Sequence, residues 1–172
     1  MSVAAVVALL DELGAGDIAH PGGDLRSHLI RTHDTLRGWS APDDVCLAGL
    51  IHAAYGTDAF PLALLPLGER PRLRLLVGEA AEAIVYRYCS CSRQVSYARL
   101  DEVPWPMTDR FTGEVVLLDR DEASAFAVLT IANERDIVQA GGVDTAGAAA
   151  IEDLVRALRP YLQVAIPEVP DE

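Results

Sequence analysis

The stretch that most strongly decides the fold is residues 45–57, which read VCLAGLIHAAYGT. A proline and two aspartates precede it, and all three are typical of the first turn of a helix. Within it, Val45, Ala48, Gly49 and His52 recur at i, i+3, i+4 and i+7, the spacing of one helical face. Small residues on that face predict close packing. We therefore expect His52 to point inward at the end of a buried helix.

The preceding helix has a histidine in the same kind of position. Leu25, His28, Leu29 and Thr32 form one face of a helix that Asp24 is suited to cap. The link to the next helix is short, which predicts near-antiparallel neighbours. The two inward imidazoles are therefore expected to converge in one cavity. The alternative is a pair of core histidines, each satisfied by its own hydrogen bond.

A later helix, over residues 121–139, carries an amide on its apolar face. Phe126, Leu129, Asn133 and Ile137 share that face. Burying the Asn133 side chain without a partner would cost about 1–3 kcal/mol. We expect its partner to be a histidine, a backbone group, a water molecule or a ligand.

The whole pattern predicts an all-α protein, a bundle of about six helices, with a short β-hairpin allowed around residues 95–118 from strands at Val95–Leu100 and Glu114–Leu118. A length of 172 residues without a long linker predicts one domain over residues 1–166 and a flexible tail at 167–172. The predicted helices cover residues 2–13, 24–38, 40–54, 72–89 with a break at Gly78, 121–139, and 145–164 with an interruption near Pro160.

Charge and composition exclude several classes of function. The formal net charge is −12, which disfavours nucleic acid as a partner because phosphate backbones require clustered cations. All 14 basic residues are arginine, a bias typical of a GC-rich bacterium. The lack of lysine excludes Schiff-base chemistry and a lysine-containing phosphate loop. A small molecule, including a small anion, remains the expected ligand, and a second copy of the chain could pair through the last helix.

The expected location is the cytoplasm. Three unpaired cysteines without framework spacing indicate a reducing compartment. The apolar run Ser2–Leu10 has no basic leader and is interpreted as an amphipathic helix rather than a signal peptide. No apolar run reaches the length of about 18 residues that a membrane span requires.

The segment Leu47–His52 resembles the "AALLHD" helix end of the HD superfamily of metal-dependent phosphohydrolases, most closely the hydrolase half of the stringent-response guanosine tetraphosphate enzymes. In that family a first histidine follows a glycine-containing loop, as His28 follows Gly22, 24 residues before His52. Leu75–Tyr86 is similar to the next helix of that family, and Leu129–Asn133 to its late "IKLAD" segment. Residues 52–57 also resemble a signature of uncharacterised HD-like proteins. The resemblance implies an HD-like helical bundle.

The resemblance also implies a divalent metal, manganese, iron or zinc, but the ligand set is reduced. His28 and His52 match the two family histidines. Ala53 occupies the position of the aspartate in the His-Asp pair, and Asn133 that of the late aspartate. Loss of both carboxylates removes the negative charge that hard cations prefer. His28, His52 and Asn133 are therefore the candidate ligands, and His20, in a glycine-rich loop, is a candidate fourth.

Other residues are candidates for catalysis or substrate binding. Glu79 and Glu82 lie at i, i+3 on one helix, where either could face the pocket as a base, the alternative being a solvated face. Tyr55 is a candidate donor to a bound oxyanion. Arg26, Arg70 and Arg74 are candidates for binding a phosphate or carboxylate, and for the last two the simpler account is salt bridges to the protein's own acidic surface.

Three classes of function remain open from the sequence. The first is a metal-dependent hydrolase or lyase acting on a small polar or phosphorylated molecule. The second is a metal-free enzyme of secondary metabolism in which His28 and His52 act as acid and base. The third is a non-catalytic domain that binds a small molecule or a partner in a degenerate HD cavity.

Overall fold

The computed structural model describes residues 2–167 and is mostly helical, as the sequence predicted. The end of the predicted tail, from residue 168 on, lies outside the described residues. Two antiparallel two-stranded hairpins accompany the helices: β1 (Ala19–His20) with β2 (Gly23–Asp24), and β3 (Trp105–Thr108) with β4 (Val115–Leu118). The eight α-helices of the described range are α1 (Val3–Glu12), α2 (Leu25–Gly38), α3 (Asp43–Gly49), α4 (Arg70–Val77), α5 (Glu79–Ser90), α6 (Arg93–Tyr97), α7 (Arg120–Gln139) and α8 (Thr145–Leu158).

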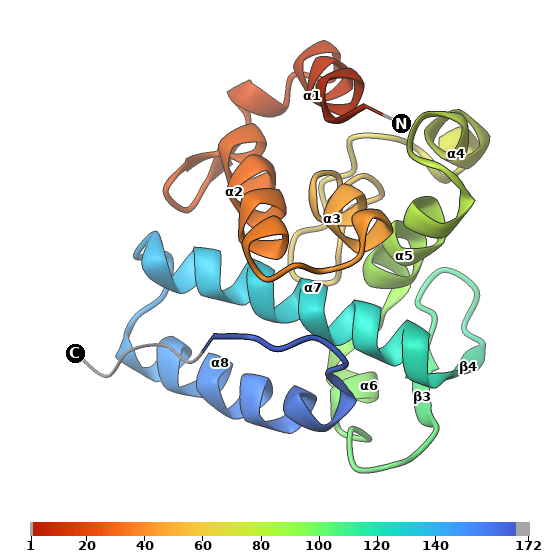
Figure 1. Ribbon diagram of the computed structural model, residues 1–172, viewed down its shortest axis with the longest axis vertical. Helices are drawn as coiled ribbons and strands as arrows, with labels where there is room; N and C mark the ends of the chain where they lie inside the picture. The colour runs from red at the N-terminus through yellow and green to blue at the C-terminus, as the bar shows by residue number, and fades with distance from the viewer. Residues whose placement is uncertain (1, 168–172) are drawn as a thin grey trace.

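Helix α7 is the centre of the fold. It crosses the molecule, with α2, α3 and α5 on one side and α8 on the other (Figure 1). Its start is fixed by a capping box, in which Asp119 accepts from the Glu122 backbone and the Glu122 side chain accepts from the Asp119 backbone. Eleven of its residues are buried, so α7 is surrounded by the other elements and can present side chains to several of them.

Helices α2 and α3 are close neighbours because α3 has a glycine at their contact. A β-carbon at Gly49 would lie only 2.3 Å from Leu36 Cδ1. The small residues read from the sequence therefore do bring these two helices together. Asp24 caps α2 as predicted, accepting from the Ser27 backbone N–H at 2.8 Å.

The helix predicted to extend to about residue 54 ends at Gly49, and His52 lies in a series of turns beyond it. Side-chain donors form hydrogen bonds with backbone carbonyls that would otherwise accept from N–H groups of a continuing helix. The Gly49 carbonyl accepts from His52 Nδ1 at 2.8 Å, and the His52 carbonyl accepts from Cys89 Sγ at 3.1 Å. The histidine is nevertheless buried, with 3% of its surface exposed. The periodicity predicted its burial but not the end of the helix.

The predicted hairpin is present, but its first strand differs. Residues 93–97 form α6, and β3 begins only at Trp105. Pro104-Trp105-Pro106 lies between the two predicted strands, whereas in the structure Pro106 lies within β3 and pairs with Leu117. In a two-stranded sheet each strand has one edge without a neighbouring strand. A proline, whose nitrogen carries no hydrogen, is tolerated when that nitrogen faces the unpaired edge.

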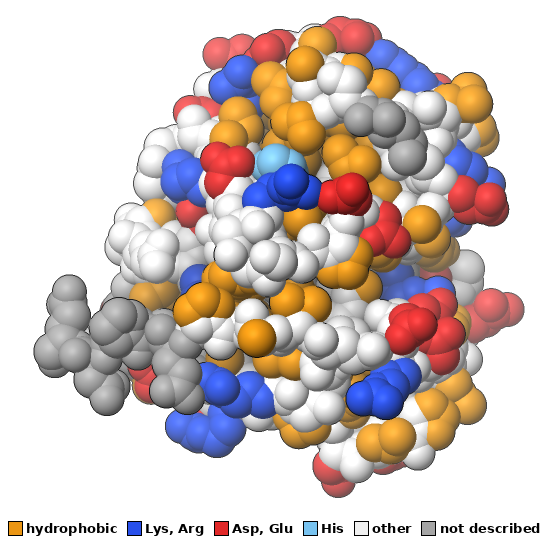
Figure 2. All heavy atoms as spheres, in the orientation of Figure 1, with side chains coloured by type: hydrophobic (Ala, Val, Ile, Leu, Met, Phe, Trp, Pro, Cys, Tyr) orange, Lys and Arg blue, Asp and Glu red, His pale blue; other side chains and the backbone are white. Residues whose placement is uncertain are grey.

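The surface carries both signs of charge. On the face that Figure 2 shows, arginine side chains are interspersed with aspartates and glutamates and do not form a continuous basic stripe. No helix among residues 2–167 combines the length and the apolar character needed to cross a bilayer.

Candidate functional site

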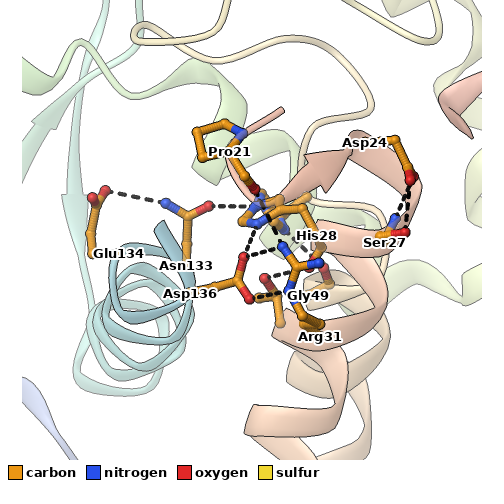
Figure 3. Close-up of polar contacts among 11 residues, drawn as sticks. Pro21, Asp24, Ser27, His28, Arg31, Gly49, Asn133, Glu134 and Asp136 are labelled. Carbon is orange, nitrogen blue, oxygen red and sulfur yellow. Dashed lines mark hydrogen bonds and ion pairs between the residues drawn. The ribbon is translucent and has the colours of Figure 1, made fainter. Parts of the chain in front are cut away.

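His28, His52 and Asn133 meet at the junction of α2, α7 and the turns after α3. The two Nε2 atoms of His28 and His52 are 3.3 Å apart, and His28 Nε2 lies 3.0 Å from Asn133 Oδ1. All three side chains are buried, at 1%, 3% and 6% exposure. Figure 3 shows the Asn133 amide reaching from α7 toward His28. The structure thus brings together the residues that the helical periodicity had selected.

The protonated nitrogen of His28 is fixed by a carboxylate. His28 Nδ1 lies 2.6 Å from Asp136 Oδ2, and Arg31 donates to both oxygens of the same carboxylate at 2.6 and 2.9 Å (Figure 3). Burial opposes ionisation of Asp136, but the hydrogen bonds from Arg31 and His28 hold its pKa below the usual value. An ionised carboxylate can only accept, so His28 Nδ1 carries the proton. Burial lowers the pKa of His28 despite this carboxylate, which leaves a lone pair on Nε2.

His52 has the same tautomer for a different reason. Its Nδ1 donates to the Gly49 carbonyl at 2.8 Å, and a carbonyl oxygen can only accept. Burial, followed by the neighbouring His28, lowers the pKa of His52 to about 3. The imidazole is therefore neutral near pH 7, with its Nε2 lone pair directed at His28.

Asn133 adds a third electron-pair donor to this point. Its Nδ2 donates to Glu134 Oε1 at 3.2 Å, which directs Oδ1 toward His28. Three lone pairs thus face one another within about hydrogen-bond distance, with no hydrogen among them. Such an arrangement is unfavourable unless a proton or a cation lies between the groups. Imidazole nitrogen and amide oxygen are donors that a divalent ion accepts.

These three groups border a hollow of about 190 Å³, which we call the histidine cavity. His20, on hairpin β1–β2, forms part of its wall, and its ring stacks on that of His28 with centroids 4.0 Å apart. Burial, together with the adjacent His28, lowers the pKa of His20 to about 4. The remaining wall is largely apolar and includes Leu25, Phe60 and Ile137.

Several polar atoms in this cavity wall lack partners. Among the described residues, five buried side-chain polar atoms make no hydrogen bond, and three of them belong to the cavity lining: His20 Nδ1, Tyr88 Oη and Arg93 Nε. Unpaired buried polar atoms are uncommon in folded proteins, and their concentration in one cavity indicates a place where a ligand or water belongs.

The sequence candidates Glu82, Arg70, Arg74 and Tyr55 form a separate group, here called the Glu82 cluster. The Glu82 carboxylate is fully buried and accepts from Arg70 at 2.7 and 3.2 Å, from Arg74 at 3.1 Å and from the Tyr55 hydroxyl at 3.1 Å. Burial opposes its ionisation, but these donors hold the pKa of Glu82 below its usual value. None of the four lines the histidine cavity.

The remaining candidates are also outside the cavity. Glu79 is exposed at the start of α5. Arg26 pairs with Asp11 on the surface. Neither side chain is among those that line the cavity.

The sequence analysis missed two residues of the candidate site: Asp136, which contacts His28 from behind, and Arg93, which lines the cavity. Asp136 lies one turn after Asn133, just as Arg31 lies one turn after His28, so the two i, i+3 pairs could have revealed the Asp136–Arg31 contact. Arg93 had no such signal, because its segment showed no clear periodicity and its position depends on the tertiary fold.

A larger hollow of about 410 Å³ lies elsewhere, between α3, α5, α7 and the segment around Val164. Its wall is mostly apolar and contains no histidine or cysteine among its described residues. We therefore take the smaller histidine cavity as the candidate site.

The donors of the histidine cavity agree only in part with the sets of side chains that usually bind metal ions. No group of three or more His, Cys, Asp or Glu side chains within residues 2–167 is arranged to hold a metal ion. The donors that do converge are two imidazoles and one carboxamide, contributed by His28, His52 and Asn133.

The fold and the cavity together define a mostly helical domain with a buried histidine site. Within it, residues 9–93 match a family model described as a domain of unknown function, DUF6817. The match includes His20, His28, His52 and Arg93 but ends before the α7 residues that complete the cavity. No curated protein and no solved structure matches the chain.

Proposed function

We propose that this chain is a divalent-metal-dependent hydrolase or lyase acting on a small polar or phosphorylated molecule, with a reduced HD-type site in the histidine cavity. The observation that carries the proposal is the meeting of three lone pairs, on His28 Nε2, His52 Nε2 and Asn133 Oδ1. The resemblance of Leu47–His52 and Leu129–Asn133 to HD-superfamily segments supports the same reading, because the three donors come in the family's order.

The spacing of the donors fits one shared ion. Two imidazole nitrogens bound to one tetrahedral ion at about 2.0–2.1 Å lie about 3.3 Å from each other. The two Nε2 atoms of His28 and His52 are 3.3 Å apart. Manganese, iron and zinc all accept imidazole nitrogen, and three protein donors leave a position open for water or substrate.

The outer contacts of the two histidines support the same function. Metal-binding histidines usually donate their other ring N–H to a carboxylate or a backbone carbonyl. His28 donates to Asp136 and His52 donates to the Gly49 carbonyl, so both partner types are present. These contacts fix each ring with its lone pair toward the cavity before any ion arrives.

The donor set is electrically neutral, which sets the expected affinity. Ala53 and Asn133 replace the two aspartates of the HD pattern. Without these charges, binding should be weaker than in sites with carboxylate ligands and should favour ions that accept nitrogen. His20 can add a fourth nitrogen only if its ring moves, because it now stacks on His28.

The ion and the side chains would contribute differently to the chemistry. A bound divalent ion would lower the pKa of a coordinated water toward neutrality. The side chains of the protein orient the site: Asp136 holds His28, the Gly49 carbonyl holds His52, and Leu25, Phe60 and Ile137 limit access of bulk water.

Metal titration of untagged, chelator-treated protein tests the proposal. Calorimetry with zinc, manganese and ferrous iron should detect one site, and His52→Gln should weaken binding by about 100-fold because it removes one of three donors. His33→Gln is the matched control, since His33 is also buried on α2 but pairs with Asp34 outside the cavity. Binding of less than about a tenth of an equivalent of every ion would exclude the metal-dependent enzyme.

Asn133→Asp sharpens the same test. It returns a carboxylate to the position where the HD pattern has one, so metal affinity should rise about tenfold. If the site is a set of core hydrogen bonds instead, the new charge would be buried without a cation and the variant would lose stability with no gain in metal binding.

The contact between His28 and Asp136 favours a second candidate. A carboxylate 2.6 Å from an imidazole nitrogen orients and stabilises the imidazole for acid–base chemistry without a metal. Activity that survives chelation, follows a bell-shaped pH profile and disappears in His52→Gln would favour this metal-free enzyme. Unchanged function in cells carrying His52→Gln would instead indicate a non-catalytic binding domain.

A further inference from the structure

Arg93 is the one charged side chain among the described residues of the cavity wall. The wall includes no aspartate or glutamate, although the whole protein carries a net charge of −12. A guanidinium stays protonated under all ordinary conditions. The described wall of the histidine cavity therefore carries one positive charge and no carboxylate.

The guanidinium also has no carboxylate partner among the described residues. Arg93 forms no ion pair with any described carboxylate within 4.0 Å, and its Nε is buried without an acceptor. It lies over the ring of Tyr88, with the guanidinium carbon 5.0 Å from the ring centroid. The Tyr88 hydroxyl is itself buried and unpaired. Arg93 Nε and the Tyr88 hydroxyl thus both lack a hydrogen-bond partner, and an oxyanion could accept from both.

The size and character of the cavity narrow the class of ligand. Its volume of about 190 Å³ is below the range of about 300–1,000 Å³ typical for drug-sized ligands. Pro21, Leu25, Phe60 and Ile137 supply apolar parts of its wall. A fitting ligand is therefore small, carries one negative charge and has an apolar part.

We propose that Arg93 is the residue that binds the substrate's anionic group, and that the substrate is a small carboxylate with a short apolar chain. This inference rests on the proposed function for its chemistry, since it names the substrate class of that same site, but the binding step itself requires no metal. The planar guanidinium matches a carboxylate with two parallel hydrogen bonds, and a single charge is neutralised by a single arginine.

Glu134 is the nearest competitor for Arg93. Its carboxylate accepts from Asn133 Nδ2, and the positive charge of Arg93 acts on it without direct contact. Glu134→Gln should therefore preserve or tighten binding of the anion.

The test compares two molecules of the same shape in chelator-treated protein. Isobutyrate carries the carboxylate, whereas isobutyramide is its neutral counterpart. In a titration followed by NMR of ¹⁵N-labelled protein, isobutyrate should bind saturably and isobutyramide at least about tenfold more weakly, because only the former makes charge-assisted hydrogen bonds. Equal binding of the two would overturn the proposal, as would saturable binding of inorganic phosphate without binding of isobutyrate.

Substitutions of Arg93 test whether this residue is responsible for isobutyrate binding. Arg93→Gln should weaken isobutyrate binding by at least about tenfold, whereas Arg99→Gln, on the exposed side of the same segment and paired with Glu102, should bind as the unchanged protein does. Arg93→Lys keeps the charge and should retain weaker binding, so it provides the test if Arg93→Gln fails to fold. Unchanged binding in Arg93→Gln would exclude the role.

The two proposals can fail separately. Arg93→Gln leaves His28, His52 and Asn133 intact, so its metal affinity should stay near that of the unchanged protein. Loss of isobutyrate binding with retained metal binding supports both proposals. Metal binding with no isobutyrate binding by any variant overturns only the role of Arg93.

Discussion

The Glu82 cluster and the histidine cavity are both buried polar groups, but they differ in how completely they are satisfied. Glu82 is fully buried, yet two arginines and a tyrosine hydroxyl donate to its carboxylate. In the histidine cavity, acceptors face acceptors, and Arg93 Nε has no partner. A satisfied cluster holds the fold together, whereas unpaired buried polar atoms are uncommon in folded proteins and mark a place where a ligand or water belongs.

The largest expected effect on stability comes from a substitution in the Glu82 cluster, whose polar groups are all satisfied. Glu82→Gln removes a buried charge from two arginines and should lower the free energy of unfolding by about 3 kcal/mol. Urea denaturation would measure it. Glu79→Gln, an exposed position one turn earlier on α5, is the control and should change stability by less than about 0.5 kcal/mol. Metal binding should survive in both variants; its loss in Glu82→Gln would mean that the two regions are not independent.

The second effect separates the two regions by pH. The pKa of His52 is about 3 in the folded protein against about 6.5 when unfolded, so below pH 6.5 the unfolded chain binds more protons and stability falls. By pH 5 the loss from this residue should be about 2 kcal/mol. The lowered pKa of Glu82 affects stability in a lower pH range. The stability that Glu82 contributes is present above pH 4.5 and is lost only as pH falls through its folded pKa.

Denaturation of the unchanged protein and of His52→Gln between pH 7 and pH 5 checks this. The variant should lose less stability over that range, because Gln does not titrate. Identical slopes would show that His52 is not held neutral by burial.

The smallest expected effect concerns the carboxylate behind His28. Asp136→Asn should lower metal affinity about tenfold, equivalent to about 1.4 kcal/mol, since the imidazole loses its charged acceptor. Asp34→Asn is a matched control, because Asp34 also contacts a histidine, His33, at 3.0 Å but outside the cavity. Should both variants bind metal as the unchanged protein does, the contact between Asp136 and His28 would serve only the fold.

The sequence predicted the parts of the site that depend on local periodicity. The apolar faces that carry His28, His52 and Asn133 predicted the burial of all three side chains and the convergence of the two histidines, and they left the partner of the Asn133 amide open. The break at Gly78 and the cap at Asp24 were likewise readable from local rules.

Features that depend on distant partners were not readable in this way. Glu82 can be buried because arginines of the preceding helix pair with it. The sequence alone is equally consistent with these arginines facing the solvent. Arg93 lines the cavity from the start of α6, a short helix that overlaps the predicted strand Val95–Leu100. Trp105 and Pro106 fell outside both predicted strands, because a strand of a two-stranded sheet has too few neighbours to impose a recognisable pattern.

One absent methyl group governs how far apart the two imidazoles sit. Because a β-carbon at Gly49 would collide with Leu36, the backbone of α3 rests directly against α2. The same glycine supplies the carbonyl that orients His52. Gly49 therefore controls the separation of the two rings: an alanine there would push the backbone of α3 away from α2 and would shift one imidazole relative to the other.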